Sequence, residues 1–82
     1  MQTEQLTAAY ELFVEIHAEF TGQSPDKVRS EITLTQFEDD LRSRHQQYMT
    51  GQISFGRFTE LIGIPHAELW DILDMMGLPL HN

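Results

Sequence analysis

Apolar residues recur at helical spacing along almost the whole chain, and the stretches between them are short. From residue 3 to residue 20, steps of 100° per residue place apolar side chains on one broad arc and glutamates on a narrow stripe opposite. The arc comprises Leu6, Ala9, Tyr10, Phe13, Val14, Ile16, His17 and Phe20, with Leu12 at its edge, and the stripe comprises Glu4, Glu11, Glu15 and Glu19. This pattern predicts a long amphipathic helix that ends before Gly22.

Two further helices are predicted between this helix and residue 50. Ser24 is a favourable N-cap and Pro25 suits a first helical position, so "SPDKVRSEI" predicts a short helix. Thr35 and Glu38 have the spacing of a capping box and are predicted to open a third helix, which runs to about Met49.

The next stretch, residues 53–77, predicts a helical hairpin with the layout of a helix-turn-helix. Ser54 can cap a first helix at residues 55–62, and Gly63 can end it. A second helix is predicted at residues 66–76. Because no convincing pair of strands is present, we expect an all-α fold, a small bundle of four to five helices with this C-terminal helix-turn-helix-like hairpin.

The length of the chain, 82 residues, is enough for one small domain and not for two. We therefore expect a single helical domain over residues 1–82, with N-terminal helices in residues 1–50, the hairpin at 53–77 and a tail at 78–82. A domain of this size has a thin core, which oligomerisation would help to stabilise. This favours a homodimer.

The charge of the chain narrows the choice of partner. Thirteen acids against five bases give a net charge of −8, which repels nucleic acid and anionic lipid and favours a basic protein partner. The bases all lie in the middle of the sequence, and they are Lys27, Arg29, Arg42, Arg44 and Arg57.

The sequence gives little support for an enzyme, a cofactor site or a metal site. The chain has no cysteine, its four histidines lack metal-ligand spacing, and it contains neither a Gly-rich phosphate loop nor a nucleophile elbow. We expect no enzyme activity and no cofactor. No apolar stretch approaches the roughly 20 residues that span a membrane, and no signal peptide is visible, so we expect a cytoplasmic protein.

About the last 30 residues of the chain resemble a family of small uncharacterised prokaryotic proteins that are often regarded as antitoxin-like. The matching residues are Ile53, Ser54, Gly56, Glu60, Leu61, Gly63, Glu68, Leu73, Gly77 and Pro79. Phe58 departs from the pattern, because the family has a small alanine there. We expect Phe58 to push the two helices apart or to force a repacking. The resemblance implies an antitoxin-like function.

The hairpin also raises an alternative, a DNA-binding transcriptional regulator. In such a motif the start of the second helix meets base edges, which would give His66 and Glu68 this role, with Arg57 near phosphate. Phosphate neutralisation supplies most of the affinity, however, and Arg57 is the only base from residue 45 onward. Nucleic acid is therefore the less favoured partner.

Protein interaction is the favoured function, as a small acidic module or regulatory adaptor. Helical spacing puts Trp70 at the flank of the apolar face of the last helix and Met75 among its acids. We expect these two side chains and the tail residues Leu78 and Leu80 to form an apolar contact. The stripe residues Glu11, Glu15 and Glu19 would attract a basic partner, unless Arg42 or Arg44 pairs with them.

Two polar residues fall on apolar faces, where an unpaired polar group would be costly. His17 lies within the arc of the first helix, and Arg44 lies on the apolar stripe of the third helix. We expect a structural hydrogen bond for His17, and a salt bridge or an extended aliphatic stem for Arg44.

Overall fold

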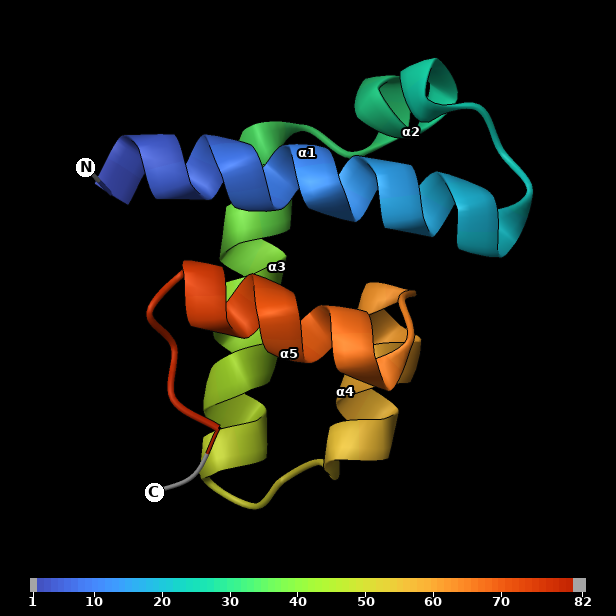
Figure 1. The fold of residues 1–82 in the computed structure, drawn as a ribbon. Helices are drawn as coiled ribbons and strands as arrows, with labels where there is room; N and C mark the ends of the chain where they lie inside the picture. Colours follow the sequence, from blue (N-terminus) through green and yellow to red (C-terminus); the bar gives the residue numbers. More distant parts are fainter. Residues whose placement is uncertain (1, 81–82) are drawn as a thin grey trace.

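The computed structural model describes residues 2–80 and contains five helices and, over that range, no strand (Figure 1). The helices are α1 (Gln2–Thr21), α2 (Pro25–Glu31), α3 (Leu34–Met49), α4 (Phe55–Ile62) and α5 (His66–Met75). The predicted all-α bundle is confirmed, and the helix count is five. None of these helices is both long enough and apolar enough to cross a membrane.

The first and last helices lie side by side in the middle of the molecule (Figure 1). α2 packs on α1 from the side away from α5, and α3 also packs against α1. α4 lies between α3 and α5 and packs against both. Helices from opposite ends of the sequence thus close the same core.

Three of the helix starts show how local sequence fixes the elements. The hydroxyl oxygens of Ser24 and Ser54 accept backbone N–H bonds at the starts of α2 and α4, as the sequence predicts. The capping box of α3 is formed by Thr33 and Gln36, so the prediction from Thr35 is wrong by two residues. Both positions fit the motif, and the earlier start places Leu34 in the first turn, where it packs against the core.

All five helices contribute to one apolar core. Its buried members are Ala9, Tyr10, Phe13, Val14, Ala18, Val28, Phe37, Leu41, Phe58, Ile62, Ile64, Leu69, Ile72 and Leu73. Phe58 is fully buried, and its ring lies near those of His45, Tyr48 and Phe55. The bulky side chain is therefore accommodated in the core, beside aromatic rings of α3 and α4.

The buried arc of α1 differs from the predicted arc at two residues. Phe20 is 61% exposed, because it lies in the last turn of α1 beside Pro65, where α5 begins. Ala18 is buried instead. It lies two turns beyond Glu11 on the same side of α1, and Glu11 contacts Arg29 of α2. α2 thus covers a strip of α1 that the sequence pattern leaves to solvent.

Candidate functional site

An exposed aromatic group lies where α4 and α5 meet. Trp70 is 50% exposed, and its ring stands edge-on to that of Phe55 at 6.2 Å and 89°. Phe55 also meets the ring of His66 edge-on, at 5.2 Å. With Ala67 and Asp71, which line a shallow hollow beside Trp70 and His66, these residues form what we call the Trp70 surface. Trp70, which helical spacing places at the flank of the apolar face, is thus half exposed, and its role in partner binding stays a prediction.

The other apolar residues predicted to join Trp70 lie elsewhere. Met75, Leu78 and Leu80 are half-buried and pack against the core, so the predicted outward orientation of Met75 is wrong. Met75 borders the buried side of α5, and the chain turns back after Gly77. Their role in partner binding stays a prediction, but each already has an intramolecular contact.

Two side chains of α3 hold the tail in place. His45 Nε2 lies 2.6 Å from the carbonyl oxygen of Pro79, and Tyr48 donates its hydroxyl hydrogen to the carbonyl of Leu80 at 2.7 Å. Both contacts satisfy backbone carbonyl groups of the tail that would otherwise need a hydrogen bond from water. Sequence reasoning missed His45, although its spacing from Leu41 and Tyr48 puts it on the apolar stripe of α3.

The acidic stripe of α1 is partly neutralised within the chain. Glu11 pairs with Arg29 of α2 at 2.8 Å, and the pKa of Arg29 is raised from its ordinary value chiefly by this hydrogen bond. Glu15 and Glu19 are exposed, and no ion pair is seen for them among residues 2–80. Glu4 of the stripe is likewise exposed and without an ion pair in the described residues, so the predicted stripe offers three carboxylates beyond the paired one.

All four arginines are held by carboxylates of this chain. Besides the Arg29 pair, Arg42 bonds Glu38 at 3.1 Å, and Arg44 lies 3.5 Å from Asp40. The salt bridge expected for Arg44 is confirmed, whereas neither Arg42 nor Arg44 reaches the α1 stripe. Arg57 lies 3.4 Å from Glu60. In the described part of the chain, Lys27 is the one base for which no such pair is seen.

The three residues of the DNA-binding alternative lie in different surroundings. Arg57 is engaged with Glu60 on α4, and His66 belongs to the Trp70 surface. Glu68 is half-buried and borders a small hollow on the other flank of α5, where Phe20 also lies. The geometry does not gather these side chains on one face.

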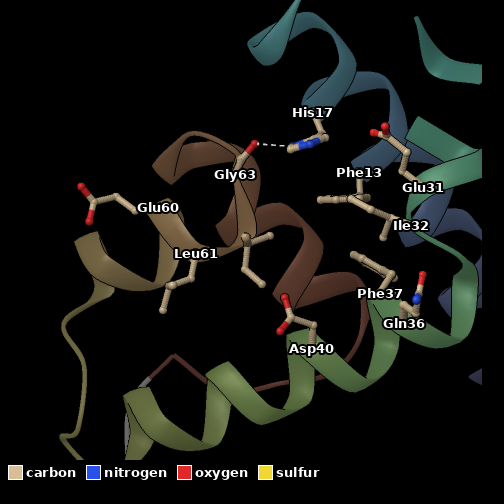
Figure 2. A pocket seen from close by; sticks show the side chains of 11 residues that line it. Phe13, His17, Glu31, Ile32, Gln36, Phe37, Asp40, Glu60, Leu61 and Gly63 are labelled. Carbon is tan, nitrogen blue, oxygen red and sulfur yellow. Dashed lines mark hydrogen bonds between the residues drawn. The ribbon is translucent and has the colours of Figure 1, made fainter. Parts of the chain in front are cut away.

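A further hollow, of about 500 Å³, lies between α1, α3 and the end of α4 (Figure 2). Its apolar lining comes from Phe13, Ile32, Phe37, Leu61 and Ile62, and its polar lining from His17, Glu31, Gln36, Asp40, Glu60 and the backbone at Gly63. We call it the α1–α3–α4 cleft. No sequence pattern indicates it, because its walls come from four separate segments.

His17 forms one wall of this cleft. Its Nδ1 lies 2.8 Å from the carbonyl oxygen of Gly63, and its ring stacks on Phe13 at 5.2 Å. Because a carbonyl oxygen only accepts, Nδ1 carries the proton and donates it. The structural hydrogen bond expected for His17 is confirmed, and it fixes the turn between α4 and α5.

No cluster of three or more potential metal ligands occurs within residues 2–80. A scan against protein-family models, a search of curated proteins and a search of solved structures each return no match to this chain.

Proposed function

We propose that this chain is a small acidic protein-interaction module that binds a basic surface of another protein. The observation that carries the proposal is the exposed aromatic Trp70 on a chain whose arginines are all engaged by its own carboxylates. Exposed tryptophan is enriched among the residues that dominate binding energy at protein interfaces. The net negative charge of this chain favours a partner whose binding surface is positively charged.

The chemistry of the Trp70 surface suits a cation with an aliphatic stem. A lysine or arginine can lie over the indole face, which attracts positive charge, while Asp71 lies beside it. A second copy of this chain is a poorer match, because it brings another net charge of −8. The homodimer inferred from the small size of the core stays a prediction, to be tested by light scattering.

Two cellular roles fit such a module. One is the acidic member of a toxin–antitoxin-like pair, which the resemblance of the last 30 residues implies. The other is a small regulatory adaptor. In both roles the chain acts by covering a basic region of its partner.

A DNA-binding regulator is the alternative function, and the hairpin layout is what favours it. The turn at residues 63–65 joins two helices of suitable length. Against it, the exposed side of α5 presents Asp71 and Asp74, which phosphate repels. Arg57 would have to leave Glu60 before it could bind a phosphate.

The test compares partner binding by wild type, Trp70→Ala and Phe20→Ala. Phe20 is a matched control, since it is even more exposed and lies on the other flank of α5. Partners are captured from the native host, and the dissociation constant of the purified partner is then measured at two salt concentrations. We expect Trp70→Ala to weaken binding about tenfold or more, and Phe20→Ala to leave it unchanged.

The same titration with duplex DNA separates the alternative. Fluorescence of the single tryptophan reports binding directly. Tight, salt-sensitive binding of DNA, with no protein captured, would overturn the proposal in favour of the regulator.

A further inference from the structure

The α1–α3–α4 cleft lies over two buried rings of the core and leaves Leu61 and Ile32 only half-buried (Figure 2). The rings are those of Phe13 and Phe37, whose centroids lie 4.8 Å apart beneath the cleft. Leu61 borders the cleft from α4 and is half-buried, yet it lies outside the set of side chains that pack on the core. An apolar side chain in this position gains stability when a further apolar group covers it.

The charged groups that line the cleft are carboxylates. Glu31 lies at the end near His17, and Asp40 lies at the opposite end, across from α4 (Figure 2). Glu60 points away from the cleft (Figure 2). No lysine or arginine lines the cleft.

We propose that the cleft receives a short basic segment of the partner protein. An apolar side chain of that segment lies between Phe37 and Leu61, and an arginine or lysine faces Glu31. This rests on the proposed function, because it takes the partner to be basic, and it adds a second contact beyond the Trp70 surface. Helix α4 links the two sites, with Phe55 in one and Leu61 in the other.

Charge complementarity selects this occupant. Glu31 is exposed and no ion pair is seen for it among residues 2–80, whereas Asp40 at the opposite end already lies 3.5 Å from Arg44. Because no lysine or arginine lines the cleft, Glu31 repels anionic segments and phosphates and attracts cations. The apolar floor favours a cation that is attached to an apolar neighbour over a free, fully hydrated one. A volume of about 500 Å³ holds a few side chains of a peptide and not a folded domain.

The test is a titration of the full chain followed by amide chemical shifts in NMR. The probe is a synthetic hexapeptide of alternating leucine and arginine. We expect the largest shifts at the amides of His17, Phe37, Leu61 and Gly63. A peptide of leucine and glutamate and a peptide of serine and arginine serve as controls, and both should bind at least about tenfold more weakly.

Two variants in the cleft and one matched control test whether the probe binds there. Leu61→Ser should weaken binding of the probe about tenfold, and Glu31→Gln about two- to fivefold. Glu4→Gln makes the same charge change in the first turn of α1, at an exposed residue outside the cleft lining, and should have no effect. Leu61 lies outside the core and Glu31 is exposed, so each variant should keep the wild-type amide spectrum away from the cleft.

The outcomes separate this inference from the proposed function. Shifts confined to the Trp70 surface, or binding insensitive to both cleft variants, overturn the inference and leave the proposed function in place. Absence of shifts at the cleft at millimolar probe also overturns it. If the isolated protein partner binds equally well to wild type and to Trp70→Ala, the proposed function fails instead.

Discussion

The middle of α5 and the tail that follows it carry apolar side chains that the fold treats differently. Trp70, in the middle of α5, is half exposed, and the one aromatic ring seen beside it in the described residues is that of Phe55, at right angles to it. Beyond its end, Leu78 and Leu80 pack on the core, and α3 holds the tail backbone with His45 and Tyr48. In the sequence these residues look alike. The difference shows that an apolar residue near a chain end is a candidate interface only when its own backbone and neighbours leave it uncovered.

The largest expected effect concerns the turn that starts α5. Gly63 has a φ of 85°, and a Cβ there would lie 2.7 Å from the ring of His17. We expect Gly63→Ala to lower the free energy of unfolding by about 3 kcal/mol, from backbone strain and the loss of the His17 bond. Urea denaturation measures it.

Gly51→Ala is the matched control for this change. Gly51 has a similar φ of 82°, but nothing lies within 4 Å of a Cβ there. Only the backbone strain remains, so we expect a loss of about 1 kcal/mol. Equal losses at the two glycines would show that the contact between His17 and the turn adds nothing.

Release of the tail should have an intermediate effect. Tyr48→Phe removes the bond to the carbonyl of Leu80 and keeps the ring, so we expect a loss of about 1 kcal/mol. Hydrogen exchange should also accelerate at the amide of Leu78, which bonds the carbonyl of Leu73. Unchanged exchange in this variant would mean that the tail does not depend on α3. The contrast between the covered tail and the exposed Trp70 would then weaken.

Replacement of Trp70 should cost less stability than either change above. Because half of the side chain is already in water, we expect Trp70→Ala to lower the free energy of unfolding by under about 1 kcal/mol. Thermal unfolding measures it. A loss as large as that of Gly63→Ala would make Trp70 a structural residue and would remove the main support for a partner surface.

The smallest effect distinguishes a carboxylate of α1 that forms an ion pair from one for which no ion pair is seen in the described residues. Glu11→Gln removes the bond to Arg29, whereas Glu15→Gln removes a charge for which residues 2–80 show no ion pair. We expect Glu11→Gln to be slightly less stable than Glu15→Gln in low salt, and the difference to vanish in molar salt. Melting temperatures at two salt concentrations give the comparison. A difference that persists in molar salt would point to packing instead of charge.

The sequence predicts the helices well because their start and stop signals are local. Ser24, Ser54 and Gly63 act within one turn of the backbone, so their roles follow from neighbouring residues alone. The capping box of α3 was misplaced because two overlapping motifs satisfy the same rule. The angle of Trp70 on a single helix places it at the flank of the apolar face, and this agrees with its half-exposed side chain.

The rest depends on contacts between distant segments. The tail is held by His45 of α3, and the cleft requires four segments at once. The ion pair between Arg29 and Glu11 is also a contact between distant segments, because the two residues lie on different helices. Periodicity within one helix contains no information about which neighbour covers which side.

The pairing of α1 with α5 sets the order in which the molecule can be completed. The face of α1 that the core needs is finished by a helix from the other end of the sequence (Figure 1). During synthesis, which proceeds from the N-terminus, α1 through α4 emerge before their last neighbour exists. Until α5 leaves the ribosome, the growing chain presents an incomplete apolar surface, so the emergence of α5 governs when this surface of α1 is protected from aggregation.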